Sequence, residues 1–373
     1  MPVRKKLLTR IMPALLLVNV VLTLFFVPSV AAEMEYTVVA GDTLWAIAVN
    51  FNTTVEDLII TNNVTNPDLI SVGQRLIIPG EQTGPSNAGN YASTPSSTSP
   101  LIAQAENPSI KRLAPVSGPG SILANHRLVS YYGNPYTGLM GVLGRYDPPT
   151  VIAKLLEQAA EYSPLSDRPI QPALHLIATV AQASAGRDGM YRARMPDTLI
   201  EEWTRYAEEN NLLLILDLQV GRADVLTEVE AIWKFLEKPH VHLALDPEFA
   251  MGPYRTPGIS IGSMDASTIN AVQARLARLA AEKDLPNKIL IVHQFLESMI
   301  TNKSSIEGDP RVDLVIDIDG FGGQAAKLSK YDYLQSVPVE YAGIKLFYRE
   351  DTDLLSPQQV MSIDPVPDVV IYQ

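Results

Sequence analysis

The stretch Val241–Phe249, with the sequence Val-His-Leu-Ala-Leu-Asp-Pro-Glu-Phe, is an apolar run that ends in two acids. A run of this kind is typical of a parallel strand that is covered on both faces. Side chains two residues apart in a strand point the same way, so Asp246 and Glu248 are expected to face one interior. Pro247 has no N–H group, so regular pairing should stop there. The two acids therefore indicate either a functional site or a strand end that caps a helix or pairs with an arginine.

Similar apolar runs recur from about residue 121 onward, separated by stretches with helical spacing of apolar residues. The predicted strands are 127–132, 173–181, 212–218, 241–245, 288–295, 312–318, 341–348 and 368–372. The predicted helices are 149–162, 196–210, 224–237, 267–283 and 323–337. Eight strands that alternate with helices over roughly 250 residues are typical of an α/β protein with a (β/α)8 TIM-like barrel. An open doubly wound sheet is the alternative, although residues 133–138 lack the glycine spacing of a nucleotide-binding turn.

The carboxyl ends of the strands meet at one face of such a barrel, and functional residues lie there. Most of the predicted strands end in polar side chains, which predicts a cleft at this face. The catalytic candidates are Glu248, Asp246, Asp217, Asp317, Asp319 and Tyr372. The candidates for substrate binding are Tyr131, Gln219, His293, Gln294, Lys345 and Tyr348.

The composition limits the classes of function. The net charge of −12 argues against nucleic acid as a partner. The chain has no cysteine, which excludes disulfides, zinc–thiolate sites and a cysteine nucleophile. Five histidines leave little room for a histidine-rich metal centre, and we predict no metal or other cofactor.

Residues 1–32 have the pattern of a signal peptide. A basic region at residues 4–10 precedes an apolar run at 11–27, and the small residues 30–32 fit a cleavage site. We therefore expect a secreted or cell-surface protein that is associated with the cell wall. An uncleaved membrane anchor is the alternative, because the apolar run is long for a signal peptide and short for a membrane span.

Residues 33–80 have the pattern of a compact strand–helix–helix–strand unit. Tyr36-Thr37-Val38, Gly41–Ala48, Leu58–Asn63 and Val72–Pro79 resemble a LysM module from end to end. The resemblance implies a βααβ fold that binds N-acetylglucosamine-containing glycans such as peptidoglycan or chitin. It further implies that the sugar lies between two loops, formed by Gly41, Asp42, Thr43 and Leu44 on one side and by Asn66, Pro67, Asp68, Leu69 and Ile70 on the other.

Residues 81–120 are rich in Ser, Thr, Pro, Gly, Asn and Ala and have no apolar period. We expect a disordered linker with a mean span on the order of 35 Å. A linker of this kind lets an anchored domain search nearby polymer. The expected order is therefore a signal peptide at 1–32, a LysM domain at 33–80, a linker at 81–120 and a barrel at 121–373.

Leu245-Asp246-Pro247-Glu248 resembles the Asp-x-Glu sequence that ends the fourth strand in barrel glycoside hydrolases acting on peptidoglycan or chitin, namely family 25 lysozymes and family 18 chitinases. The resemblance implies that Glu248 is the proton donor and that Asp246 assists the substrate's acetamido group. Tyr372 or Tyr348 would orient that group. We expect Glu248 to keep its proton, because the acids crowded in one cleft cannot all stay charged. A retaining mechanism assisted by the acetamido group is expected.

The chain departs from both families. The first strand ends in Tyr-Tyr-Gly without the acid of family 25, and Val241, His242 and Ala244 replace the longer acidic series of family 18. The eighth strand ends in Tyr372 instead of tryptophan. One alternative is therefore a catalytically inert barrel that binds glycan.

The other alternative is a metal-dependent deacetylase or phosphodiesterase. Its ligands would come from Asp217, Asp246, Glu248, His293, Asp317 and Asp319. No pair of histidines stands at a strand end, which argues against this class. We expect a monomer whose partner is peptidoglycan or a chitin-like glycan, with no membrane contact beyond an uncleaved anchor.

Overall fold

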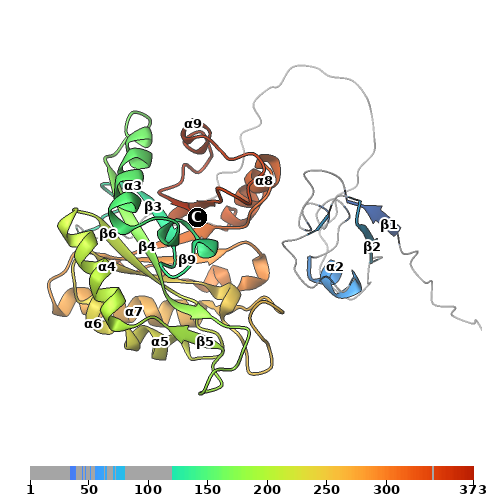
Figure 1. The fold of residues 1–373 in the computed structure, drawn as a ribbon, viewed down its shortest axis with the longest axis horizontal. Coiled ribbons are helices and arrows are strands. Elements are labelled where there is room, and N and C mark those ends of the chain that lie inside the picture. The colour runs from blue at the N-terminus through green and yellow to red at the C-terminus, as the bar shows by residue number, and fades with distance from the viewer. Residues whose placement is uncertain are drawn as a thin grey trace, which may run out of the picture.

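The computed structural model describes residues 34–38, 44, 47, 51, 55–62, 64, 70, 71, 73–79, 120–337 and 340–373. The expected signal peptide and nearly all of the expected linker lie outside these residues. The described residues form a small N-terminal unit, drawn in blue in Figure 1, and a large unit coloured from green to red.

The N-terminal unit contains a two-stranded antiparallel sheet and a helix. β1 (Met34–Thr37) pairs with β2 (Arg75–Ile78), and α2 (Val55–Asn62) contacts β2. Asn62 ties the helix to the sheet, because its Nδ2 donates to the Ile77 carbonyl at 2.8 Å and its Oδ1 accepts from the Ile77 N–H at 2.6 Å. The buried core consists of Val38, Leu44, Ile47, Leu58, Leu76 and Ile78.

The large unit is a closed barrel of parallel strands, which confirms the predicted fold (Figure 1). The pairings β13–β3 and β3–β4 close the ring. The eight strands are β3 (Arg127–Gly133), β4 (Ile170–Ala181), β6 (Leu213–Leu218), β7 (Val241–Leu245), β9 (Lys288–Gln294), β11 (Val312–Ile318), β12 (Tyr341–Leu346) and β13 (Val369–Tyr372). Their long runs of Val, Ile and Leu follow from burial on both faces.

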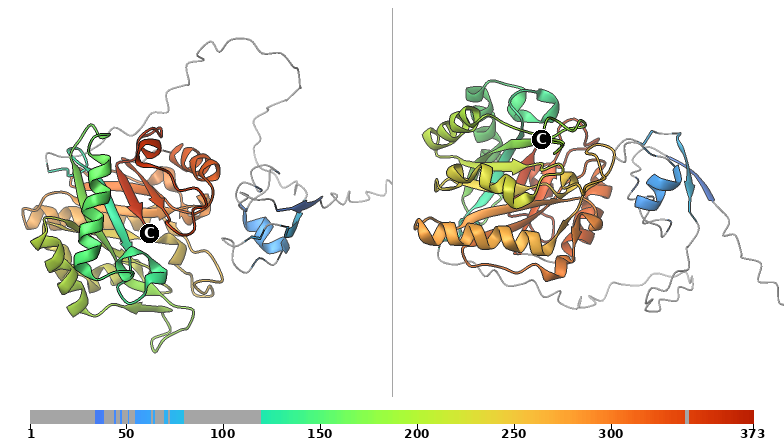
Figure 2. Two further views of the ribbon diagram at one scale, coloured as in Figure 1. Left: turned by 45° about the horizontal axis from the view of Figure 1, so that its top comes forward. Right: turned by 90° about the horizontal axis from the view of Figure 1, so that it is seen from below.

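Helices cover the outside of the ring, as two further views show (Figure 2). They are α3 (Pro148–Tyr162), α4 (Asp197–Glu209), α5 (Val225–Ala231), α6 (Trp233–Leu236), α7 (Ala266–Glu282), α8 (Gln324–Gln335) and α9 (Pro357–Val360). The helix predicted over 224–237 is divided at Ile232 into α5 and α6. The side chain of Asp224 caps α5 by accepting from the Thr227 N–H at 2.9 Å. None of the helices in the described part of the chain is long and apolar enough to cross a lipid bilayer.

Several short elements outside the ring were not predicted, because they are too short for a periodic pattern. β5 (Arg192–Arg194) lies antiparallel to β4, and β8 (Met264–Asp265) pairs with β10 (Ile300–Thr301). Glu228 of α5 holds β5, because its buried carboxylate accepts from Arg192 Nε at 2.9 Å and from Arg194 Nε at 2.7 Å. Single 3-10 turns are η1 (Gly138–Met140), η2 (Val142–Gly144), η3 (Pro247–Phe249), η4 (Glu297–Met299) and η5 (Lys303–Ser305).

The interior of the barrel changes from apolar to polar along the strands. Near the amino ends the inward side chains are apolar, as at Leu128, Ile289 and Val369. Toward the carboxyl ends the inward positions carry polar side chains that are at most 3% exposed, namely Tyr132, His175, Asp217, Asp246, His293, Asp317 and Lys345. A polar layer in a dry interior is costly unless its members are paired or used.

The segment 120–124 closes the barrel at the amino ends of its strands. Asp313 of β11 accepts from the N–H groups of Ile122 at 2.8 Å and Leu123 at 2.9 Å, and from Asn287 Nδ2 at 2.8 Å. Burial raises the pKa of Asp313, and these hydrogen bonds limit the rise. The side chain of Leu123 is fully buried among the inward apolar residues. The described chain therefore enters the barrel at the face opposite the carboxyl ends of the strands.

Candidate functional site

A cavity of about 290 Å3 opens at the carboxyl ends of the barrel strands. Aromatic, acidic and amide side chains and one lysine line it, including Tyr132, Gln219, Asp246, Glu248, Phe249, Phe295, Asp319, Phe321, Lys345 and Phe347. A larger hollow of about 400 Å3 lies beside the start of α7. Its acid Asp265 is already bound to the side chains of Ser267, Thr301 and Asn302. The converging charged groups therefore place the candidate site at the barrel mouth.

Asp246 and Glu248 both line the cavity, but not as neighbours on one strand. β7 ends at Leu245, and Pro247 begins the turn η3. The Asp246 side chain starts this turn by accepting from the Glu248 N–H at 3.2 Å. The predicted end of pairing at Pro247 is confirmed, whereas the argument that both acids share one strand face does not apply to a 3-10 turn. Asp246 is buried and Glu248 is half-buried.

Asp246 has a pKa near neutrality. Burial raises the pKa of Asp246 to about 7, and the charges of Asp217 and Asp319 add to the rise against those of His293 and Lys345. We expected such a rise at Glu248, the neighbouring acid. A carboxyl group with this pKa suits a residue that takes part in acid–base chemistry.

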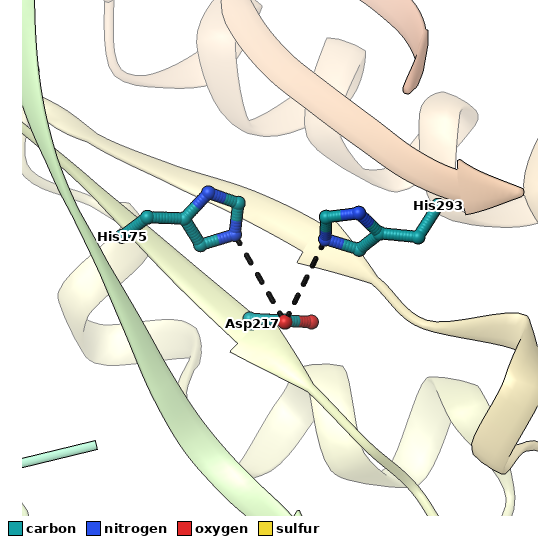
Figure 3. Close-up of side chains that lie close together, drawn as sticks. All are labelled: His175, Asp217 and His293. Carbon is teal, nitrogen blue, oxygen red and sulfur yellow. Dashed lines mark ion pairs between the residues drawn. The ribbon is translucent and has the colours of Figure 1, made fainter. Parts of the chain in front are cut away.

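Three side chains from three strands meet inside the barrel, one inward layer before the cavity. Figure 3 shows the rings of His175 on β4 and His293 on β9 pointing toward the carboxylate of Asp217 on β6. Their Nε2 atoms lie 4.0 and 3.7 Å from the same oxygen, Asp217 Oδ2. The Tyr132 hydroxyl donates to this oxygen at 2.7 Å. The sequence analysis did not select His175, although a histidine in the middle of an apolar strand is a signal that could have found it.

Two further acids approach His293 at its other nitrogen. Asp317 Oδ2 lies 2.8 Å from His293 Nδ1, and Asp319 Oδ2 lies 3.7 Å from it. Burial lowers the pKa of His293, but the hydrogen bond to Asp317 and the charges of Asp217 and Asp317 outweigh it and raise the pKa to about 9. Asp317 fits against β12 because residue 343 is glycine, where a Cβ would lie 2.9 Å from Asp317 Oδ1.

Lys345 brings a positive charge to the cavity. Its Nζ lies 3.7 Å from the centroid of the Tyr132 ring and 3.6 Å from Asp319 Oδ2. Gln219 also lines the cavity, with its Nε2 3.4 Å from the Tyr132 hydroxyl. The structure thus brings Gln219 and Lys345 to the cavity and places His293 in the layer before it.

Four predicted site residues point out of the ring, namely Tyr131, Gln294, Tyr348 and Tyr372. The rings of Tyr348 and Tyr372 stack with centroids 5.2 Å apart, and the Tyr372 and Tyr162 hydroxyls lie 2.7 Å apart, so this cluster packs against α3. Gln294 Oε1 accepts from Lys303 Nζ at 2.9 Å. None of the four is among the described residues that line the cavity. Strand alternation was the unused signal, because Tyr131 and Tyr132 must face opposite sides.

Of the glycan-binding residues predicted in the N-terminal unit, the structure describes Leu44 and Ile70. Leu44 is buried in the core of the unit, and Ile70 packs against that core. Gly41, Asp42, Thr43, Asn66, Pro67, Asp68 and Leu69 lie outside the described residues. The sugar site between the two loops therefore stays a prediction.

Residues 36–79 match the LysM domain family. The secreted LysM effector ECP6 of Passalora fulva is 41% identical over 64 residues, which are 17% of this chain and 28% of that protein. The cortical fragment-lytic enzyme of Bacillus subtilis (strain 168) is 50% identical over 44 residues, which are 12% of this chain and 10% of that protein. The chain thus spans less than a third of the curated relatives that it matches.

Three solved structures are similar at low scores. The spore cortex-lytic enzyme SleL of Bacillus megaterium QM B1551 has 11% identity and a TM-score of 0.32, over 88% of this chain and 68% of that one. SleL of Bacillus cereus has 13% identity and a TM-score of 0.31, over 87% and 79%. The GH20 beta-N-acetylhexosaminidase of Streptomyces coelicolor A3(2) has 11% identity and a TM-score of 0.31, over 67% and 59%. Scores at this level transfer no residue role to this chain.

The family match and the described elements β1, α2 and β2 agree on the N-terminal unit. Residues 36–79 are therefore a LysM domain, and it precedes a closed parallel barrel of eight strands.

Proposed function

We propose that this protein is a cell-wall-associated glycoside hydrolase. The LysM domain holds an N-acetylglucosamine-containing glycan, and the barrel cleaves glycosidic bonds in peptidoglycan or a chitin-like polymer. The carrying observation is that Asp246 and Glu248 line one cavity at the barrel mouth in different environments. Glycoside hydrolysis needs one carboxyl group that holds a proton and one that is ionised. The names of the two curated relatives, a secreted LysM effector and a cortical fragment-lytic enzyme, support a glycan outside the cytoplasm as the ligand.

The two acids have separate roles in the proposed reaction. Glu248, half-buried in the cavity wall, gives its proton to the leaving oxygen as the glycosidic bond breaks. The substrate's acetamido oxygen attacks the anomeric carbon, and Asp246 accepts a hydrogen bond from the acetamido N–H. A pKa of about 7 leaves Asp246 partly ionised at neutral pH, which this role requires. Water then opens the cyclic intermediate, with Glu248 as the base, and the anomeric configuration is retained.

The remaining cavity residues suit a sugar. Phe249, Phe295 and Phe321 offer apolar surface to the faces of pyranose rings. Asp319 and Lys345 offer an acceptor and a donor for hydroxyl groups.

The test compares the wild-type chain with Glu248→Gln and Glu282→Gln on peptidoglycan and on N-acetylglucosamine oligomers. We expect kcat/KM for release of reducing ends to fall by about 10²- to 10⁴-fold in Glu248→Gln, because a general acid is lost. Glu282 is exposed on α7, so Glu282→Gln should keep the wild-type rate. Both variants should still sediment with insoluble peptidoglycan.

Two results would change the assignment. Equal release by Glu248→Gln and wild type would remove Glu248 from the proposed role. A wild type that sediments with glycan but releases no reducing ends would leave a glycan-binding barrel without catalysis.

A further inference from the structure

We infer that His175, Asp217 and His293 form a binding site for a divalent transition metal ion of the zinc class, inside the barrel and one layer below the cavity. This site was not predicted, because His175 was not selected and the ligands considered for a metal lay at the strand ends. The inference stands apart from the proposed hydrolase function.

The three side chains surround a dry point with unused ligand atoms. All three are 0% exposed. Within the described part of the chain, neither ring nitrogen of His175 has a hydrogen-bond partner, and His293 Nε2 and Asp217 Oδ1 have none either. Buried polar atoms without partners are unfavourable, and each calls for an explanation such as an ion or a water molecule. Several of them around one point favour a single shared ligand.

The spacing is close to that of a coordinated ion. One ligand atom from each residue lies within 4.8 Å of the others, and the two Nε2 atoms lie 4.0 and 3.7 Å from Asp217 Oδ2. Zinc binds nitrogen and oxygen at about 2.0–2.2 Å, so tetrahedral ligand atoms stand roughly 3.3–3.6 Å apart. Small side-chain rotations would therefore close the site around an ion.

Neighbouring groups already orient two of the ligands. His293 Nδ1 lies 2.8 Å from Asp317 Oδ2, so its N–H is donated there and Nε2 faces Asp217. A carboxylate that holds the second nitrogen of a histidine is the usual outer partner of a metal-bound imidazole. The Tyr132 hydroxyl fixes Asp217 in the same way at 2.7 Å. An ion at this point replaces the proton on His293 Nε2 and leaves both outer hydrogen bonds in place.

The charge of the barrel interior favours an added cation. Four carboxyl groups, Asp217, Asp246, Asp317 and Asp319, are at most 5% exposed there. In the described structure, the cationic partners facing them are His293 and Lys345. Two imidazoles and one carboxylate prefer zinc, cobalt, nickel or iron over magnesium or calcium, which favour all-oxygen sites.

The experiment measures metal binding directly. The full chain is stripped with a chelator and titrated with Zn²⁺ and Co²⁺, with Mg²⁺ and Ca²⁺ for comparison. We expect close to one equivalent of Zn²⁺, a rise in Tm and a visible Co²⁺ ligand-field spectrum, and neither a rise in Tm nor stoichiometric binding with Mg²⁺ or Ca²⁺. Asp317→Asn should weaken the Zn²⁺ Kd by about 10- to 100-fold, because it removes an outer partner of a ligand.

His175→Asn should abolish stoichiometric binding, and His242→Asn is its matched control. His242 is also 0% exposed in the barrel and also has an Nε2 without a partner among the described residues. Its Nδ1 accepts from the Ile289 N–H at 3.1 Å, a bond that an asparagine oxygen can also accept. His242→Asn should therefore keep the wild-type metal content. Glu248→Gln should keep it too while losing turnover, so the two proposals can fail separately.

Two outcomes would overturn the site. One is a wild type that binds no stoichiometric transition metal, and the other is equal binding by His175→Asn and wild type. If His175→Asn does not fold, zinc-edge X-ray absorption of the wild type decides without a variant. Two imidazole ligands are expected there, and a spectrum without imidazole would refute the assignment.

Discussion

Replacing Gly343 with alanine is expected to destabilise the barrel from inside. A Cβ at residue 343 would lie 2.9 Å from Asp317 Oδ1 and 3.0 Å from Asp317 Cα. The carboxylate can rotate, but the Cα belongs to the adjacent strand β11, so relief requires β11 and β12 to move. Overpacking of this kind costs about 1–3 kcal/mol. If Asp317 turns away, it also loses the 2.8 Å hydrogen bond to His293, and breaking a buried pair on one side costs about 3–5 kcal/mol.

Since the two costs overlap, we expect a loss of about 3 kcal/mol in the free energy of unfolding. For a domain of this size this is a fall in Tm of roughly 6–12 °C. Urea unfolding of the full chain, followed by near-UV circular dichroism, measures the change. Gly252→Ala is the matched control, because nothing lies within 4 Å of a Cβ built there.

A double variant tests the physical cause. In an Asp317→Ala background the carboxylate contact is absent, so Gly343→Ala should cost less there by about 0.5–3 kcal/mol. An equal cost in both backgrounds would show that the side chain of Asp317 is not involved. Equal stability of Gly343→Ala and Gly252→Ala would refute the whole argument from close packing.

Two further changes concern buried charges. Glu228→Gln should lower the free energy of unfolding by about 2–3 kcal/mol, since its 0% exposed carboxylate binds Arg192 and the partly exposed Arg194. Glu230→Gln, in an exposed ion pair, should cost less than about 1 kcal/mol in the same urea assay, and equal costs would contradict the difference in burial. Burial lowers the pKa of Lys288 to about 7, so between pH 7 and the usual lysine pKa the unfolded chain holds a proton that the folded chain lacks. The free energy of unfolding of wild type should therefore rise with pH relative to Lys288→Met, by up to about 1.4 kcal/mol per pH unit, and parallel pH profiles would refute the shift.

The barrel could be predicted because its strands are covered on both faces and its helices are periodic. The predicted bounds of β7 and β11 agree with the structure. The break at Ile232 was missed, because the apolar period continues across it and the backbone alone changes. The turn at Pro247 was predicted as an end of pairing, but its 3-10 form depends on the Asp246 side chain that starts it.

The polar ends of the strands also predicted a cleft at the correct face, although the residues that meet there were only partly predicted. Which inward side chains share a layer depends on the tilt and register of the closed ring. In this ring Tyr132 pairs with His175, and His293 pairs with Asp317. No local pattern carries that information, because the partners are far apart in sequence and their strands become neighbours only on folding.

The closure of the barrel floor by residues 120–124 has a mechanical consequence. Any tension applied through the chain before residue 120 is delivered to the base, first to the hydrogen bonds that Asp313 makes with Ile122 and Leu123. The opening on the opposite side carries none of that load. A bead or sensor surface coupled through the N-terminal part of the protein would therefore present the opening outward, toward material in front of the support.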